Sequence, residues 1–563
     1  MSGLQTIAAH ALWYALCLPE SLRFHACVNR VADTQRQLLL DLLQRNAGTE
    51  YGRTHGFASI RSVAEFQSRV PLTAYDDYQG LIERAAAGEP RVLTADPVLL
   101  LEPTSGSTAA TKLIPYTASL KSEFQRAIAT WIVDLYSHDR RILSGEAYWS
   151  VTPVMRHERR TGGGVPIGFA DEGEYLGRWQ RTAVNSIMAV PPVVKSIDEM
   201  ESFRYVTLLF LLRSRRLALI SIWNPTFLTL LVGRLVEWGQ ALARDIAGGT
   251  ITAPAPLHAD VMATLRANMR PDARRAAEVA AACDAAREAG GLCARLWPNL
   301  RVISCWTDAH AALHVDELAR LFPQARVQGK GLLATEGCVS FPLIGHRNAA
   351  LAFRSHLFEF LPAENEHGAT DSVVPALAHE LTEGQRYSVV ITTGGGLYRY
   401  RLHDVIEVTG HLGDCPLIRF TGKGDHVSDW FGEKLNDMHV ELAMAPAFAR
   451  HLVTPVFAML ACETEHGRPA YSLFIEITGR SAEALLSVAR AIDVALQENF
   501  HYRYCRDLGQ LGPLRVFRIE SGALGSYLSA CQARGHRAGD IKPVALHHLD
   551  GWSKVFRGAF VTE

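Results

Sequence analysis

Short apolar runs typical of buried strands alternate along this chain with longer segments whose apolar residues recur at helical spacing. LALISIW (217–223), VISCWT (302–307) and YSVVITT (387–393) are such runs. Residues 34–46 and 119–136 instead have the period of amphipathic helices. Because strand-like and helical patterns keep alternating, the sequence favours an α/β fold class.

The chain has 563 residues, which is too long for a single hydrophobic core. Its character changes after RFTGKGDHVSDWFGEKLND (419–437). Residues 438–563 carry helix–strand–helix patterns and have the size of a small α+β domain. We therefore predict an N-terminal domain over residues 1–421 and a C-terminal domain over residues 422–563.

The composition narrows the classes of function. Apolar residues make up 48% of the chain and charged residues 20%, as in a soluble globular protein. The formal net charge is −1, which argues against a nucleic-acid-binding protein because such proteins usually have a basic excess. The ten cysteines are scattered without a CxxC pair, which indicates free thiols in a reducing compartment and neither disulfides nor a zinc site.

Two apolar segments bear on localisation. The N-terminal segment lacks the early basic residues and the small-residue cleavage site of a signal peptide. The most apolar stretch, Val206–Trp223, is interrupted by Arg213, Arg215 and Arg216, so we expect a buried strand or helix there and not a membrane span. We expect a cytoplasmic protein without a membrane partner.

The stretch EPTSGSTAATKLIPYT (102–117) has the composition of a phosphate-binding loop. Small hydroxyl residues around a glycine let backbone amides and hydroxyls approach an anion, and a lysine just beyond supplies a positive charge. It is not a Walker A loop, because the second glycine before the lysine is missing. The alternative is a polar surface turn between two strands. The candidate residues are Thr104, Ser105, Gly106, Ser107, Thr108, Thr111 and Lys112.

A second glycine-containing stretch is VQGKGLLATEG (327–337). Gly329, Gly331 and Ala334 satisfy a GxGxxA pattern, but no convincing helix follows and the next acidic residues are badly placed for a ribose contact. The adjacent Thr335 and Glu336 suit a phosphate contact and a magnesium ligand better. The alternative for this pair is an ordinary capping role.

Two further candidate site residues are single residues, each without another candidate beside it. Asp404 ends an aromatic and basic run that begins at Tyr398, and its carboxylate could accept both hydroxyls of a ribose. A salt bridge to Arg399 or Arg401 is the alternative. Lys542, in GDIKPV, carries no local pattern of its own, and a lone lysine is usually solvated.

In their order along the chain these motifs resemble the adenylate-forming superfamily. More closely, the chain resembles the bacterial branch of the Gretchen Hagen family of acyl-acid amido synthetases. The resemblance covers nearly the whole chain. It is carried by AGTEYGRTHGF (47–57), VPLTAYDDY (70–78), TSGSTAATK (104–112), SIWNPTF (221–227), QGKGLLATEG (328–337), YRYRLHD (398–404) and HYRYCRDLGQLGPLRV (501–516).

The resemblance implies a large N-terminal adenylate-forming domain, with mixed sheets flanked by helices, and a small mobile C-terminal lid. It also implies ATP and Mg²⁺ as cofactors and a two-step ligase reaction. A carboxylate attacks the α-phosphate of ATP, which gives an acyl-adenylate and pyrophosphate, and an amine, usually an amino acid, then takes the acyl group. The implied partners are a small carboxylic acid and an amine.

Residue roles carry over by motif. Thr104, Ser105, Gly106, Ser107 and Thr108 match the phosphate loop, which Lys112 closes.

The other implied roles fall on residues farther along the chain. Gly331 belongs to the second motif, where Thr335 and Glu336 match the contacts to the α-phosphate and to magnesium. Asp404 matches the acid that holds the ribose, and Lys542 the lysine that enters the site during adenylation.

This sequence departs from the plant pattern of the family at two places. Ala109 and Ala110 replace glycines, which makes the loop stiffer, and His403 replaces a glycine beside the ribose acid. Neither change removes a charge that the chemistry needs. An adenylate-forming ligase with a thiol or alcohol acceptor and a non-catalytic nucleotide-binding protein stay open as alternatives. The sequence identifies neither the acid, the acceptor nor the oligomeric state.

Overall fold

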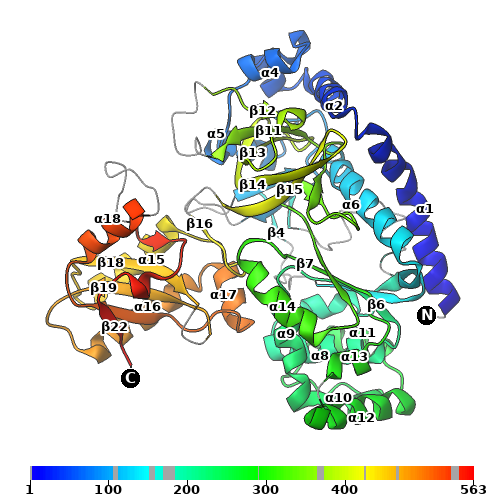
Figure 1. Cartoon of the computed structure of the whole chain (residues 1–563), viewed down its shortest axis with the longest axis vertical. Helices are drawn as coiled ribbons and strands as arrows, with labels where there is room; N and C mark the ends of the chain where they lie inside the picture. The colour runs from blue at the N-terminus through cyan, green and yellow to red at the C-terminus, as the bar shows by residue number, and fades with distance from the viewer. Residues whose placement is uncertain are drawn as a thin grey trace. The chain divides into compact units, whose positions relative to one another are not determined.

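The computed structural model describes residues 3–104, 112–150, 159–168, 184, 186–289, 291–363, 373–423, 427–464, 468–533 and 544–562. Two compact units can be recognised (Figure 1). The first comprises Met1–Thr104 and Leu113–Gly424, and the second includes Asp425–Glu563. Each unit has its own sheet system and hydrophobic core, so we describe them separately.

One sheet of the first unit is parallel and has the strand order β3–β6–β7–β8. All side chains of β6 and β7 are buried, which explains why the sequence has continuous apolar runs there. These strands are β3 (Glu146–Trp149), β6 (Leu217–Ser221), β7 (Val302–Cys305) and β8 (Arg326–Gly329).

The larger sheet of the first unit has seven strands in the order β12–β11–β13–β14–β15–β10–β9, with antiparallel neighbours. Side chains of β14 alternate between buried and half-buried, as the alternating sequence predicts. The strands are β9 (Ser340–Phe341), β10 (Ala349–Leu351), β11 (Leu357–Pro362), β12 (Ala376–Leu377), β13 (Arg386–Thr392), β14 (Tyr400–Leu412) and β15 (Cys415–Lys423).

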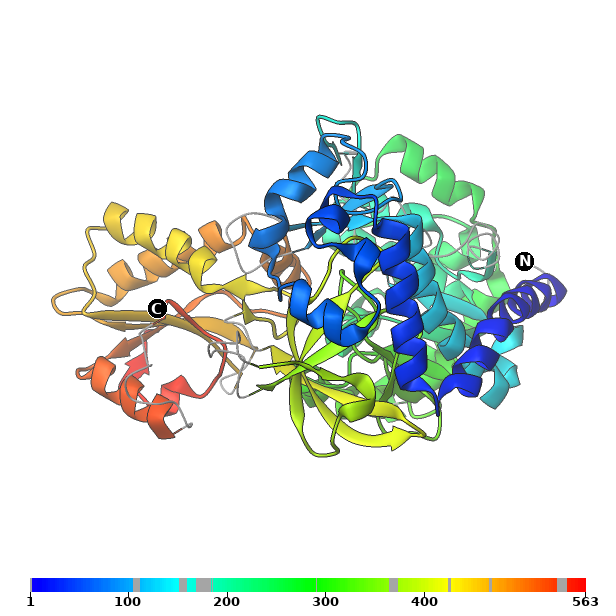
Figure 2. The same ribbon diagram turned by 90° about the horizontal axis from the view of Figure 1, so that it is seen from above.

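Helices cover these sheets and share one core with the antiparallel sheet, to which α1, α2 and α6 contribute apolar side chains. Helix α1 lies beside α6, where His10 Nδ1 is 2.8 Å from the Tyr136 hydroxyl (Figures 1 and 2). The helices of this unit are α1 (Gly3–Cys27), α2 (Val31–Asn46), α3 (Glu50–Thr54), α4 (Val63–Arg69), α5 (Tyr75–Ala86), α6 (Ala118–His138), α8 (Met200–Arg213), α9 (Pro225–Gly233), α10 (Leu235–Gly248), α11 (Ala259–Ala267), α12 (Ala273–Ala289), α13 (Leu292–Leu296) and α14 (Val315–Leu321).

A smaller sheet has the order β2–β1–β5–β4 and contains the two strands that flank the predicted phosphate loop. The strand before the loop, β1, ends at Thr104, and the strand after it, β2, begins at Lys112. The apolar run before this loop predicts a strand there, and β1 confirms it. The bounds are β1 (Leu100–Thr104), β2 (Lys112–Tyr116), β4 (Arg159–Arg160) and β5 (Pro166–Ile167).

The second unit is built on a five-stranded sheet of order β21–β18–β19–β20–β22, with buried apolar clusters on both faces. Alternate residues of β18 face opposite clusters: Leu460 joins the cluster that includes α16, and Met459 the cluster that includes α18. Figure 2 shows yellow and orange helices on one face and the red helix on the other. The elements are β16 (Val427–Ser428), β17 (Leu435–Asn436), α15 (Asp437–Arg450), β18 (Phe457–Glu463), β19 (Ala470–Glu476), α16 (Ala482–Leu496), α17 (Phe500–Asp507), β20 (Arg515–Ile519), α18 (Ala523–Ala533), β21 (Leu546–His547) and β22 (Gly558–Phe560).

The apolar stretch Val206–Trp223 forms most of helix α8 followed by β6, and both are buried, as expected. Within the described residues, no helix combines the length and apolarity that crossing a membrane requires. The sequence predicts that Asn224 and Pro225 cap a long helix reaching about Ile246, and Asn224 does cap α9, because its side chain accepts a hydrogen bond from the Thr226 amide. The expectation of one helix continuing to Ile246 is wrong, since the Arg234 amide bonds back to Leu231 just after Gly233 and a new helix, α10, begins.

Candidate nucleotide site

Thr335 and Glu336 occupy the tip of a tight turn that follows strand β8. Leu333 pairs with Cys338 in an antiparallel bridge at the base of this turn. The Ala334 amide donates to the Gly337 carbonyl at 3.0 Å, and the Gly337 amide donates back at 3.3 Å. Thr335 and Glu336 are therefore the two central residues, and both are half-buried. We call the segment Ala334–Gly337 the acidic turn.

The approach to the acidic turn requires glycine at position 331. Gly331 has a φ of +75°, and an added Cβ would lie 2.5 Å from the Ser340 carbonyl oxygen. The neighbouring Leu332 amide donates to Ser340 Oγ at 2.9 Å. The segment after β8 forms this close crossing and no helix, so the geometry does not support the Rossmann alternative.

The two ends of β2, the strand that follows the predicted phosphate loop, bond to different neighbours, and one of these neighbours is the acidic turn. At one end the Tyr116 hydroxyl donates to the Thr335 carbonyl. At the other end the Leu113 amide donates to the Tyr75 hydroxyl at 2.8 Å. Burial raises the pKa of Tyr75, and the negative charges of Glu83, Asp76 and Glu336 add to the rise. The C-terminal end of β2 and the acidic turn, which are more than 200 residues apart in sequence, are thus neighbours in the first unit.

The segment that contains Thr73 and Tyr75 also reaches the third motif. The Thr73 amide donates to the Arg399 carbonyl at 3.0 Å, and the Arg401 amide donates to the Thr73 carbonyl at 2.9 Å. Thr73 Oγ1 donates to the Tyr398 carbonyl at 2.9 Å. The motif VPLTAYDDY (70–78) contributes to the family resemblance, but a threonine and a tyrosine near a helix start show no chemical pattern that predicts these contacts.

Asp404 lies on β14, opposite Lys423 of the neighbouring strand β15. Its side chain is 4% exposed. Arg399, one of the two arginines considered as its partner, binds Glu359 at 2.9 Å and also donates to the Gln67 and Val70 carbonyls. The Arg399 half of the salt-bridge alternative is therefore wrong, since the guanidinium is held on a different carboxylate.

His403 explains one departure from the plant pattern. Its φ is +59°, in the left-handed region, and the register between β13 and β14 shifts nearby. Glycine adopts this region freely, whereas histidine adopts it at a modest cost. The backbone here needs the conformation that glycine favours, and this chain reaches it with histidine.

Cation and aromatic groups collect at the carboxyl end of the parallel sheet, where ligands bind in many α/β proteins. Lys330 Nζ donates to Ser221 Oγ at 2.5 Å and lies 5.2 Å from the centre of the Trp223 ring. The rings of Trp223 and Trp306 are 5.7 Å apart and both residues are half-buried. Phe341, in contrast, is a core residue packed against Phe24.

The side chain of Thr104 and the whole of Ser105, Gly106, Ser107, Thr108 and Thr111 lie outside the described residues, as does Lys542. Of the remaining candidates, Thr335 bonds to Tyr116 at the C-terminal end of β2, and Glu336 is its neighbour in the acidic turn. Asp404 lies on the sheet strand to which Thr73 pairs.

Comparison with known proteins finds the same family along most of the chain. The model for the GH3 family N-terminal domain matches residues 21–327, that for the central domain residues 349–423, and that for the C-terminal domain residues 438–547. A probable indole-3-acetic acid-amido synthetase, GH3.7 of Oryza sativa subsp. japonica, is 26% identical over 93% of this chain and 92% of its own length. Indole-3-acetic acid-amido synthetase GH3.17 of Arabidopsis thaliana is 24% identical over 90% of each chain.

Solved structures support the α/β fold class at low sequence identity. The GH3.15 acyl acid amido synthetase superposes with a TM-score of 0.61 and 20% identity, covering 96% of this chain and 95% of that one. AtGH3.15 in complex with 2,4-DB gives a TM-score of 0.64 at 19% identity, covering 96% and 97%. The likeness extends over both units, and it establishes the fold.

Proposed function

Because this chain belongs to the GH3 family, we propose that it is an ATP-dependent acyl-acid amido synthetase, a ligase that forms carbon–nitrogen bonds through an acyl-adenylate. The observation that carries the proposal is the acidic turn. Its Thr335 carbonyl accepts a hydrogen bond from the Tyr116 hydroxyl, at the end of the strand that follows the serine- and threonine-rich loop, and Glu336 is the next residue of the turn. Relatives that share the three domains are named amido synthetases.

The reaction balances in two steps. A carboxylate oxygen of the acid forms a bond to the α-phosphorus of ATP, and the bond to pyrophosphate breaks. The amine nitrogen then attacks the acyl carbon, AMP leaves, and the nitrogen loses a proton. Both steps need positioning and neutralisation of charge more than a covalent catalyst.

The residues of the acidic turn fit a magnesium ion. A carboxylate and a hydroxyl stand side by side at a half-buried turn tip, and these are the hard oxygen ligands that Mg²⁺ prefers. Glu336 would hold the ion, which supplies positive charge to the phosphates when bound. Thr335 would contact the α-phosphate, and Asp404, on the antiparallel sheet, would accept the ribose hydroxyls.

Further roles rest on sequence resemblance. Thr104, Ser105, Gly106, Ser107 and Thr108 would bind the phosphates with their hydroxyls and amides, and Lys112 would close that loop. The remaining role falls to Lys542.

Lys542 would enter the site during adenylation and leave it when the amine is admitted, because the small C-terminal domain acts as a lid. The motif set also supports a place in the bacterial branch. Scattered cysteines without a CxxC pair support the cytoplasm. The substrates would be a small carboxylic acid and an amino acid.

Carboxylate-dependent exchange of labelled pyrophosphate into ATP tests the proposal. The full-length protein should catalyse exchange with at least one member of a broad acid panel, and mass spectrometry of the product with mixed amines, alcohols and coenzyme A should show an amide. A thioester or an ester as the product would show that the acceptor is a thiol or an alcohol and not an amine. A folded protein that catalyses no pyrophosphate exchange with any acid would overturn the proposal.

Variants make the test specific to the assigned residues. Glu336→Gln should lower exchange by about 100-fold, because one charge at the reacting phosphates is lost. Glu317→Gln, an exposed glutamate on α14, is the matched control and should leave the rate unchanged. Lys542→Ala should abolish adenylation and spare ATP binding, whereas a non-catalytic binding protein would have no activity to lose.

A further inference from the structure

Two buried polar side chains that the proposed chemistry does not use lie directly under the acidic turn. Glu123, on α6, is 5% exposed, and His356, just before β11, is fully buried. His356 Nδ1 lies 2.8 Å from Glu123 Oε2. The Cys338 amide, at the base of the acidic turn, donates to His356 Nε2 at 3.1 Å.

The donors fix the protonation pattern of this pair. A backbone N–H can only donate, so Nε2 of His356 must be the acceptor for Cys338. Nδ1 then carries the proton and donates to the Glu123 carboxylate. The carboxylate also accepts the Gly394 amide, which is 3.0 Å from each of its oxygens. One hydrogen-bonded chain therefore runs from the glycine turn at 394–396, through Glu123 and His356, to the acidic turn.

Neighbouring residues leave room for these hydrogen bonds and hold His356 in place. An added Cβ on Gly337 would lie 2.9 Å from His356 Nε2, and one on Gly394 would lie 2.6 Å from Glu123 Oε1. Both glycines thus let the backbone approach the two side chains. The backbone of His356 is held as well, because Gln35 Nε2 donates to its carbonyl at 2.7 Å.

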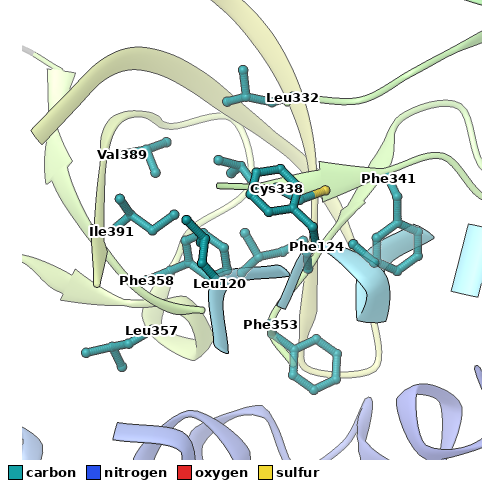
Figure 3. Close-up of a cluster of buried hydrophobic side chains, with 14 of the residues drawn as sticks. Leu120, Phe124, Leu332, Cys338, Phe341, Phe353, Leu357, Phe358, Val389 and Ile391 are labelled. Carbon is teal, nitrogen blue, oxygen red and sulfur yellow. The ribbon is translucent and has the colours of Figure 1, made fainter. Parts of the chain in front are cut away.

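Apolar residues exclude water from the pair. Phe124 and Phe358 contact the imidazole edge-on, with ring centres 6.1 and 5.8 Å away. Figure 3 shows Phe124 and Phe358 in the same cluster as Leu332 and Cys338, which flank the acidic turn in sequence. Hydrogen bonds in such a dry setting are strong, and an unpaired partner there is costly.

We propose that Glu123 and His356 are positioning residues of the nucleotide site, which hold the turn bearing Thr335 and Glu336 through the Cys338 amide. This inference rests on the proposed function for its link to ATP. The pair touches neither substrate nor metal. Its contribution is to fix the turn against the sheet, so that Thr335 and Glu336 do not have to be ordered when the nucleotide binds.

Two near-isosteric variants of His356 separate the contacts. His356→Gln can place an oxygen near the Nε2 position and keep an acceptor for Cys338, while it loses the bond to Glu123. His356→Asn can keep a donor for Glu123 and leaves the Cys338 amide without an acceptor. We expect His356→Asn to lower kcat/KM for ATP in the exchange assay by about tenfold, and His356→Gln by less than about threefold.

Glu123→Gln gives an independent test with almost no change in shape. An amide has one acceptor oxygen, so either Gly394 or His356 then faces an NH₂ donor. Phe358→Leu is the control for packing alone: it should lower the melting temperature and leave KM for ATP within about twofold. If the polar variants and Phe358→Leu change KM for ATP equally, the pair is merely structural and the proposal is wrong.

A double-mutant cycle and amide exchange complete the experiment. Glu123→Gln should lower the rate of pyrophosphate exchange. This effect should be at least threefold smaller in a Thr335→Val background, because the contact that the turn makes through Thr335 is then already lost. Deuterium uptake of a peptide covering 333–338 should rise about tenfold in Glu123→Gln and stay unchanged in Phe358→Leu. An additive cycle or an unchanged uptake would overturn the proposal. Deuterium uptake does not depend on catalysis. If the unmodified protein catalyses no pyrophosphate exchange, the proposed function is therefore wrong, but the positioning role of Glu123 and His356 is still tested by the uptake.

Discussion

Buried glutamates are stabilised differently in the two units of the molecule. In the first unit Glu359 is 1% exposed and faces the Arg399 guanidinium at 2.9 Å. In the second unit Glu433 is fully buried, and its donors among the described residues are two amides, of Trp430 and Phe431, and the Tyr471 hydroxyl. One carboxylate is balanced by a full positive charge, and the other by dipoles.

This difference determines which perturbation each unit is sensitive to. A charge pair in a dry interior is lost only at great cost when one member is removed. A carboxylate surrounded only by dipoles can take up a proton instead. Burial raises the pKa of Glu433 to about 7, and the negative charge of Asp429 adds to this rise. The first unit should respond to removal of charge, and the second unit to pH.

The largest effect is expected from breaking the charge pair. Glu359→Gln leaves Arg399 buried without its counter-charge and should lower the free energy of unfolding of the first unit by about 3–5 kcal/mol. Urea unfolding followed by circular dichroism measures it. Glu407→Gln, which breaks the more exposed Arg419–Glu407 pair of the same sheet, is the control and should cost less than about 1 kcal/mol. Equal losses would show that burial of the pair does not matter.

The second unit should lose stability as pH rises. The folded pKa of Glu433, about 7, is above its ordinary value of 4.5, so its contribution is fully present below pH 4.5 and is lost as pH rises through 7. The loss is about 3 kcal/mol and should be absent in Glu433→Gln. Deuterium uptake in β18 and β19, measured from pH 4.5 to 8, follows it. Parallel pH profiles for the two proteins would refute the assignment.

A smaller effect should come from the glycine that precedes the acidic turn. Gly331→Ala meets both a left-handed backbone and the Ser340 carbonyl, and should cost about 2 kcal/mol of stability and most of the exchange activity. Gly345→Ala has a φ of +93° with open space around the added Cβ, so it carries the strain alone. If both variants lose activity equally, the close crossing at Ser340 is not important for the site.

The smallest effect is expected at His403. His403→Gly should change stability by less than about 1 kcal/mol, because relief of the left-handed strain offsets the greater freedom of glycine in the unfolded chain. Thermal unfolding and exchange activity should both stay near their original values. His403→Val should be clearly less stable, since β-branched residues rarely adopt this conformation. A destabilised glycine variant would assign the histidine side chain a structural role.

The features of this fold that the sequence predicts are those that produce a local periodic pattern of apolar residues. The apolar runs at 217–223 and 302–307 became buried strands, and residues 119–136 became α6, because burial of one face imposes a period on the sequence. The sequence predicts a glycine-permitted turn before Thr335 and Glu336, whereas the structure has both residues at the tip of a turn. The division of the chain at residues 421–422 into a catalytic domain and a lid stays a prediction.

The buried polar contacts were not predictable in this way. Glu123 and His356 are 233 positions apart, and each looks like an ordinary polar residue in its own element. Arg399 was considered only with Asp404, its neighbour in sequence, whereas its partner Glu359 lies 40 positions away on β11. Such pairs are set by the approach of strands and helices in the folded chain, which no local period records.

A crystal structure of the full chain with a non-hydrolysable acyl-adenylate analogue and Mg²⁺ would test the central claim most directly. We predict that Glu336 lies on the metal, that Thr335 contacts the α-phosphate position, and that the Asp404 carboxylate accepts both ribose hydroxyls. A nucleotide bound away from the acidic turn, or one whose ribose is far from Asp404, would contradict the account.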